Sequence, residues 1–334
     1  MSAPSPWNWR PGHPALLEQP ATLLRLDGPD TLRFLHGQTS QALALARAGE
    51  RLATCCISPT ARLRALAQVL VDSDGAWLVV EAGDGEAVRT ALDRVLFPAD
   101  AVRLGPVEPV RLLEPVGPAA DPATPASGPV DPPSAAAGHW QAFDDGSGWA
   151  LDDGRLLLRP DAPLPAALTA LPRLGPTAAE RWRIQRGVPA PPGEINEEVN
   201  PFELGLAPRV RLDKGCYVGQ ETLARLATYD GVKQQLRRWF LADGEGQPAS
   251  APQPGLDLRH AAGERAGQLS SVLRLESSDG WSGWIGLALV RRAALEEATL
   301  LAGDSGSVLN LSTPEAFVAP PVGAGGQPGG QGRS

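Results

Sequence analysis

The stretch "DKGCYVGQE", residues 213–221, gathers side chains that are well suited to chemistry. It holds Cys216, one of only three cysteines in 334 residues, two positions after Lys214. A nearby ammonium favours the thiolate, the reactive form of cysteine. Gly215 and Gly219 permit tight turns and a close approach of ligand to backbone. The stretch therefore indicates a reactive cysteine; the alternative is a buried, inert thiol with solvated charged neighbours.

A second candidate stretch is "GEINEEVNPFELGL", residues 193–206, in which four glutamates alternate with apolar residues. Such a loop is either solvated and acidic, or it holds a carboxylate partly buried. A buried carboxylate needs a partner. A flat heterocycle with a guanidine-like edge is suitable, because a carboxylate can accept two parallel hydrogen bonds from it. The segment "GQTS", residues 37–40, is by itself typical of a helix end.

Other common catalytic patterns are missing from the sequence. The four histidines, at positions 13, 36, 139 and 260, are scattered, and there is no paired metal-ligand spacing or phosphate-binding loop. We therefore expect neither a zinc site nor a histidine-based triad.

The elements that must position these residues alternate between strands and helices. Residues 22–26, 64–71 and 77–81 have strand character, and "DSDG" predicts a hairpin between the last two. Helical spacing follows Pro29 and recurs over residues 85–96. The segment "TAAERWRIQRG" predicts a helix with a Thr177–Glu180 capping box and a stop at Gly187. From about residue 236 the pattern is short β segments with glycine turns, so the class is α+β.

Length and composition limit the classes of protein. A chain of 334 residues with 43% hydrophobic residues has room for two or three domains. A net charge of −8 argues against direct nucleic-acid binding and against a membrane-surface role. No secretory leader or membrane span is visible, and the odd number of cysteines suits a reducing compartment. We therefore expect a cytoplasmic protein.

Four stretches resemble the YgfZ-like proteins, which are relatives of the glycine-cleavage T-protein and include folate-dependent iron–sulfur cluster assembly factors. "DKGCYVGQE" is similar to their specific K-G-C-[Y/F]-x-G-Q-E signature. "LDGPDTLRFLHGQTSQAL" resembles their G-x-D-x-x-x-F-L-x-G-Q pattern, and "RIQRGVP…EINEEVNPFELGL" resembles R-x-x-x-G-[I/V]-P…P-x-E-x-G-L. "GLALVRR" resembles G-L-A-x-[V/I]-R-R, so the matches run from about residue 21 to about residue 295.

The resemblance implies an α+β, three-domain aminomethyltransferase-like (GcvT) folate-binding fold around a central opening, with a C-terminal β-barrel-like domain. It implies tetrahydrofolate or a derivative as ligand, with Glu197 holding the pterin edge. Cys216 would be the reactive thiol, Lys214 its neighbour, and Gly215 and Gly219 the motif glycines, with no bound metal. Further folate contacts are expected from Gln38, Tyr217, Gln220, Glu221 and Arg225.

The sequence departs from the resemblance at three places. Arg64 and Ala65 occupy the positions where T-proteins carry an aspartate pair, so the catalytic carboxylate of aminomethyl transfer is missing. Residues 59–62 read Pro-Thr-Ala-Arg where YgfZ-like proteins usually have P-K-G-R. Gln41 stands where relatives often have Asn or Asp.

These observations favour a tetrahydrofolate-binding, YgfZ-like protein that supports iron–sulfur cluster assembly or repair and, through it, tRNA-modifying enzymes. Its partners would be the folate and iron–sulfur assembly or client proteins. The alternatives are a folate-dependent aminomethyl or one-carbon transferase, and a folate-binding module without chemistry.

The expected organisation has two parts of a folate-binding region, a C-terminal β domain, an insertion and a tail. We expect the folate-binding parts at residues 15–113 and 139–235, and the β domain at residues 236–317. Residues 114–138, rich in Pro and Ala, are expected to form a flexible insertion, and residues 318–334 a disordered tail.

Overall fold

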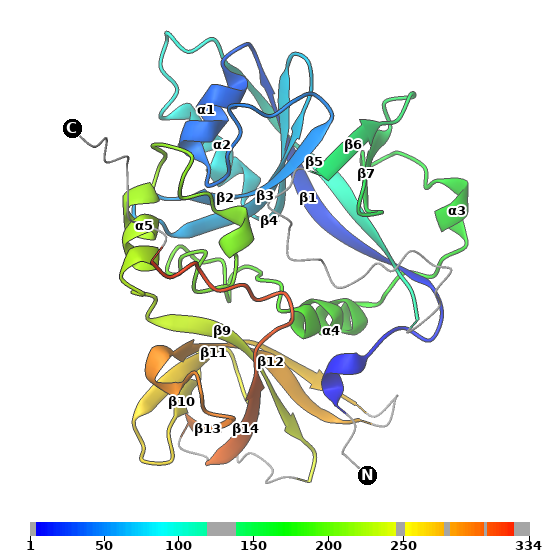
Figure 1. The fold of residues 1–334 in the computed structure, drawn as a ribbon. Helices are drawn as coiled ribbons and strands as arrows, with labels where there is room; N and C mark the ends of the chain where they lie inside the picture. The colour runs from blue at the N-terminus through cyan, green and yellow to red at the C-terminus, as the bar shows by residue number, and fades with distance from the viewer. Residues whose placement is uncertain (1–4, 119–137, 245–250, 277–280, 304–305, 324–334) are drawn as a thin grey trace, which may run out of the picture.

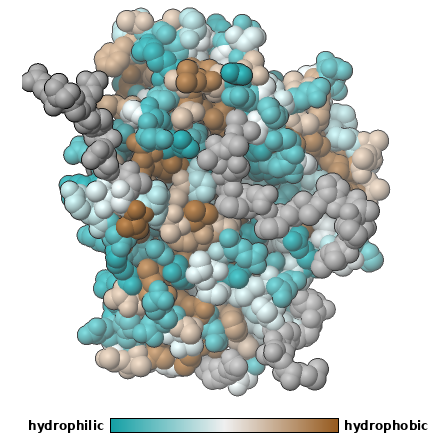
Figure 2. All heavy atoms as spheres, viewed as in Figure 1, coloured by the Kyte–Doolittle hydropathy of each residue, from teal (hydrophilic) through white to brown (hydrophobic). Residues whose placement is uncertain are grey.

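The computed structural model describes residues 5–118, 138–244, 251–276, 281–303 and 306–323. Two closed β-barrels lie at opposite ends of the molecule, and helices and loops fill the layer between them (Figure 1). Figure 2 shows hydrophobic and hydrophilic residues interspersed over the same face, as on most protein surfaces. The α+β class predicted from the sequence is confirmed.

The first barrel closes in the strand order β1-β4-β3-β2-β6-β7-β8-β5. The predicted "DSDG" hairpin joins β3 and β4, with Val71 opposite Ala76. The two helices α1 (Thr31–Gln38) and α2 (Gly85–Asp93) pack on this barrel through buried side chains such as Leu35 and Leu92. The strands are β1 (Ala15–Asp27), β2 (Glu50–Ile57), β3 (Leu63–Val71), β4 (Gly75–Gly83), β5 (Arg103–Val116), β6 (Gly138–Ala142), β7 (Gly148–Leu151) and β8 (Leu156–Leu158).

The first barrel crosses the boundaries expected from the sequence. Residues 114–116, expected in the insertion, are the end of β5 and pair with residues 15–17 of β1. Strands β6, β7 and β8 belong to the same barrel, because they bridge the open edges of β2 and β5. Most of the expected insertion, residues 119–137, lies outside the described residues.

The predicted C-terminal β domain is the second barrel, which closes in the order β10-β11-β12-β9-β14-β13. Its interior packs around the buried side chains of Trp239, Leu258 and Leu309. Its strands are β9 (Gln234–Ala242), β10 (Asp257–Arg259), β11 (Arg265–Leu275), β12 (Gly283–Arg291), β13 (Thr299–Ala302) and β14 (Ser307–Ser312), with the 3₁₀ turn η3 (Arg292–Ala294) after β12.

The middle layer contains α4 (Pro176–Arg186), η2 (Ala207–Arg209) and α5 (Gln220–Thr228), and η1 (Pro6–Asn8) packs near α4. Helix α3 (Ala166–Thr169) lies beside the first barrel, where Leu168 packs against Leu16, Leu113 and Leu158 (Figure 1). Helix α4 ends at Gly187 in the left-handed conformation, as predicted. The predicted capping box is wrong: Gly175 is the N-cap, without a side-chain cap, and Glu180 pairs with Arg183. Pro176 at the first position starts the helix instead.

The chain returns from the second barrel to the middle layer. Residues 318–323, expected in a disordered tail, are ordered against it: Val318 N–H donates to Gly205 O, and Gly323 N–H donates to Ala227 O of α5. Residues 324–334 lie outside the described residues. One apolar cluster joins all three layers, with Leu66 from the first barrel, Phe202 and Leu223 from the middle, and Ile285 from the second barrel.

Candidate functional site

We call residues 213–221 the motif loop; it is bound to the end of α1 and to the turn at residues 58–61. Val218 N–H donates to Gly37 O at 3.0 Å. Gly219 has a φ of +78°, and a Cβ there would lie 2.9 Å from Ser58 O and 3.1 Å from Ala61 Cα. Gly215 has a φ of +97° but has open space around it. The two motif glycines therefore serve different purposes: Gly219 permits close packing, and Gly215 permits a turn.

Lys214 anchors the motif loop. Its ammonium donates to the carbonyl oxygens of His36, Thr39 and Gln41, at 2.8 Å for the last two, and lies 4.3 Å from the centre of the Tyr217 ring. Burial lowers the pKa of Lys214 to about 7, whereas the three carbonyl oxygens favour the charged form. Three acceptors use all three N–H groups. Lys214 therefore binds the end of α1 and the residues directly after it, whereas the expectation was that it activates Cys216.

The three cysteines occupy contrasting environments. Cys216 is exposed, whereas Cys55 and Cys56 are buried in β2. Burial raises the pKa of Cys55 to about 11 and that of Cys56 to about 12. The described residues contain no group of three or more metal-binding side chains that could hold an ion. The structure thus leaves Cys216 as the accessible thiol, and its reactivity stays a prediction.

The other predicted residues of this region are dispersed around the motif loop. Tyr217 is buried in the cluster between the layers, and burial raises the pKa of its hydroxyl. Gln220 donates to Leu212 O at 3.1 Å, so its amide stabilises the loop. Glu221 and Arg225 are exposed on α5, and Gln38 is half-buried at the end of α1.

Glu197 does not have the environment expected of a partly buried carboxylate. Its side chain is 55% exposed, and it accepts a hydrogen bond from Arg64 Nε at 3.0 Å. The buried glutamates of this loop are Glu194 and Glu203. Arg183, Ala190 N–H and the Ser271 hydroxyl bind Glu194, and Asn200 N–H binds Glu203. The loop therefore satisfies its buried carboxylates from within the protein, and the exposed Glu197 pairs with Arg64 of β3.

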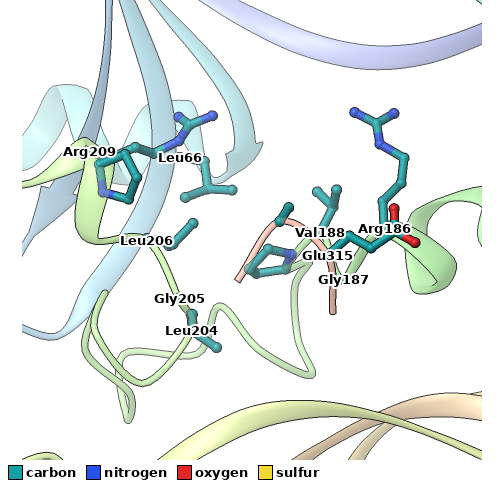
Figure 3. A pocket seen from close by; sticks show the side chains of 12 residues that line it. Leu66, Arg186, Gly187, Val188, Leu204, Gly205, Leu206, Arg209 and Glu315 are labelled. Carbon is teal, nitrogen blue, oxygen red and sulfur yellow. The ribbon is translucent and has the colours of Figure 1, made fainter. Parts of the chain in front are cut away.

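A cavity with a ligand-sized volume lies between the barrels. We call it the central cavity; its main compartment has about 430 Å³ and is lined by β1, β3, β4, β5, α4, the loop at residues 188–191 and η2. A smaller compartment of about 80 Å³ shares Leu66, Arg186, Val188 and Arg209 with it and extends to residues 204–206. Figure 3 shows Arg186 and Arg209 on opposite sides, both extending toward the first barrel.

Largely buried ion pairs form the polar parts of the cavity wall. Glu81 Oε1 accepts from Arg155 and Gln68, each at 2.6 Å, and its Oε2 lies 3.3 Å from Arg209. Burial alone would raise the pKa of Glu81, but the guanidinium groups of Arg155 and Arg209 lower it overall. This carboxylate is therefore ionised and fully bonded.

A second buried pair joins β5 to α4 across the cavity wall. Glu114 Oε1 accepts from Arg186 Nη1 at 2.7 Å and from Trp182 Nε1 at 3.2 Å. The guanidinium of Arg186 lies over the Trp182 ring, 5.3 Å from its centre. The pair therefore presents charged groups and an aromatic edge to the same compartment.

The lining of the two compartments, within the described residues, includes none of the folate-binding residues predicted from the sequence. The charged residues that line it, among them Glu81, Glu114, Arg155 and Arg186, were not predicted. Glu81 and Glu114 each interrupt an apolar strand, in "WLVVEA" and "VRLLEPV". A charge in such a position requires a buried partner, so this interruption was the available signal.

Comparison with known proteins agrees with this architecture. The fold is similar to that of the glycine cleavage system aminomethyltransferase T from Bartonella henselae, with a TM-score of 0.68 and 17% identity over 92% of this chain and 87% of the other. The chain thus has the aminomethyltransferase T fold.

At the level of sequence, the chain is 30% identical over 286 residues to the Arabidopsis thaliana protein "Putative transferase At1g60990, chloroplastic". The match covers 81% of this chain and 63% of that protein, so the chain spans less than two thirds of its relative. No family model matches. No helix in the described ranges is long and apolar enough to cross a membrane.

Proposed function

We propose that the chain binds tetrahydrofolate or a derivative in the central cavity. The observation that carries the proposal is this cavity of about 430 Å³, apolar with a few converging charged groups, in an aminomethyltransferase T fold. Cavities of this size and composition suit small organic ligands. Titration of the full chain with tetrahydrofolate tests the proposal; saturable one-to-one binding is expected, and its absence would overturn it.

We further propose that the protein acts as a YgfZ-like factor in the cytoplasm, supporting iron–sulfur cluster assembly or repair and, through it, tRNA-modifying enzymes. Its partners are then iron–sulfur assembly or client proteins, and the cluster is cargo. The support is the exposed thiol of Cys216 in the "DKGCYVGQE" loop. An exposed thiol is accessible to a protein partner, whereas Cys55 and Cys56 are not.

A deletion strain complemented with variants tests this role through the activity of iron–sulfur enzymes. Wild type and Cys56→Ala, the matched cysteine control, are expected to restore activity, and Cys216→Ala is expected to fail. Full complementation by Cys216→Ala would remove the thiol from the mechanism.

A folate-dependent one-carbon transferase is the second candidate, and the name of the Arabidopsis relative favours it. Against it, Arg64 is paired with Glu197 and Ala65 is buried, so neither position supplies an acid or base for aminomethyl transfer. An aminomethyl-transfer assay with tetrahydrofolate as acceptor separates the two candidates. Turnover would favour the transferase; binding without turnover, joined to loss of complementation by Cys216→Ala, favours the iron–sulfur role.

A further inference from the structure

The carboxylate of Glu114 has one oxygen open to the central cavity. Its side chain is 12% exposed and lines the main compartment. Both of its hydrogen bonds, from Arg186 Nη1 and Trp182 Nε1, reach Oε1. Within the described structure Oε2 has no hydrogen-bond donor. Two donors on one oxygen fix the carboxylate plane, so Oε2 is an acceptor held in place before any ligand arrives.

Arg186 supplies unused donors beside this acceptor. Its side chain is 13% exposed, and the buried Nε–H has no hydrogen-bond partner. The Nε atom has almost no accessible surface, so the donor that a ligand oxygen can reach is Nη2, for which the described residues supply no acceptor. Arg186 also lines both compartments, so its guanidinium faces the space that a ligand would fill. Acceptor and donor thus stand side by side, with Arg186 over the face of Trp182 and Glu114 at the N–H edge of the same ring.

The other carboxylates that line the cavity do not offer the same arrangement. Glu81 is bonded on both oxygens by Gln68, Arg155 and Arg209. Glu315 is exposed to solvent. A charge-assisted bond is strongest where water is excluded. Glu114 therefore combines burial, ionic character and a free oxygen.

We infer that Glu114 and Arg186 bind the 2-amino-4-oxo edge of a pterin; this inference rests on the proposed folate binding. Oε2 of Glu114 accepts the protons of the 2-amino group and N3, and Arg186 donates to the neighbouring O4. The edge carries donors next to an acceptor, which matches an acceptor next to a donor on the wall. Glu114 thus takes the role that the sequence assigned to Glu197.

Tetrahydrofolate titration calorimetry of the full chain tests the inference with Glu114→Gln. The glutamine side chain is uncharged, and its NH2 group can point at the N–H groups of the pterin, which are themselves donors. Affinity is therefore expected to fall about 30-fold or more. Glu108→Gln is the matched control, because Glu108 lies on the same strand and pairs with Arg159 away from the cavity. Glu108→Gln and Glu197→Gln are expected to bind within about twofold of wild type.

A ligand analogue adds a readout that a purely structural role would not change. The 2-desamino-2-methyl analogue of tetrahydrofolate lacks the amino group. Wild type is expected to bind it at least about tenfold more weakly than tetrahydrofolate, and Glu114→Gln is expected to lose most of this discrimination. If Glu114→Gln does not fold, as judged by its thermal midpoint, Glu114→Asp is used instead. This variant keeps the charge, but its shorter side chain moves the carboxylate away from the ligand. Its loss of tetrahydrofolate affinity is expected to be smaller than that of Glu114→Gln.

The outcomes separate the inference from the proposed function. If wild type binds tetrahydrofolate and Glu114→Gln binds it equally well, the assignment of Glu114 is overturned while folate binding stands. A loss of binding in Glu197→Gln alone would return the pterin edge to Glu197. If wild type itself does not bind, the proposed function fails and this inference fails with it.

Discussion

The motif loop and the central cavity are built in opposite ways. The loop is one continuous segment, and its conspicuous residues hold it against α1 and the turn at residues 58–61. The cavity wall comes from four strands, α4 and η2, which are distant in sequence. The residues of the recognisable motif therefore do not line the central cavity. The motif holds a surface thiol in place, whereas the cavity is formed by segments that the tertiary structure brings together.

Among the variants that test this difference, Lys214→Met is expected to have the largest effect, because it removes the anchor of the motif loop. The change leaves the carbonyl oxygens of His36, Thr39 and Gln41 without their shared donor, which should lower the free energy of unfolding by about 3–5 kcal/mol. Urea unfolding measures the loss, with Lys233→Met as control, because Lys233 is exposed in the connection between α5 and β9. A loss below about 1 kcal/mol would show that Lys214 is not an anchor.

The two motif glycines provide a matched pair. Gly219→Ala combines a left-handed φ with a Cβ 2.9 Å from Ser58 O, so we expect a loss of about 2–4 kcal/mol. Gly215→Ala has the same kind of φ but open space, so strain alone should cost about 1–2 kcal/mol. Denaturant midpoints measure both. Equal losses would contradict the assignment of Gly219 to close packing, and neither change should alter folate affinity.

The buried thiols predict a pH dependence of stability. The folded pKa of Cys55, about 11, lies above the usual value near 8.5, so the folded state holds its proton more tightly. This stability is present below pH 8.5 and is lost as pH rises toward 11. Between pH 8 and pH 10, wild type should lose about 2 kcal/mol more than Cys55→Ala. Parallel pH profiles of the two proteins would contradict the burial of this thiol.

The sequence predicted the architecture better than the ligand site. Strand and helix patterns around "DSDG" and Gly187 are local, and both features appear in the structure. The end of the first barrel was misplaced, because the short strands β6, β7 and β8 carry little periodic signal and are defined by pairing with β2 and β5. Glu114 was assigned to an insertion for the same reason, since only the pairing with β1 shows where β5 ends.

The candidate residues show a similar division. The burial of Cys55 and Cys56 agrees with the apolar residues around them in β2. Glu197 is exposed and Glu194 is buried. The sequence cannot predict this difference, because both residues lie within four positions of the same loop. The difference depends on contacts with Arg183 of α4 and Ser271 of β11, which the fold brings to the loop. Contacts between segments that are distant in sequence thus determine which glutamate is buried, and the local sequence pattern does not show them.

The central claim is that the folate binds in the central cavity and not at the thiol of the motif loop. Tetrahydrofolate binding by two single variants tests this claim most directly. Val188 lines both compartments, so Val188→Phe fills ligand space and should weaken binding roughly tenfold or more, equivalent to about 1.4 kcal/mol. Cys216→Ser lies outside the lining and should leave the affinity within about twofold of wild type. Both proteins are compared at equal folded fraction. Loss of binding in Cys216→Ser, with full binding retained in Val188→Phe, would contradict the account and place the folate at the motif loop.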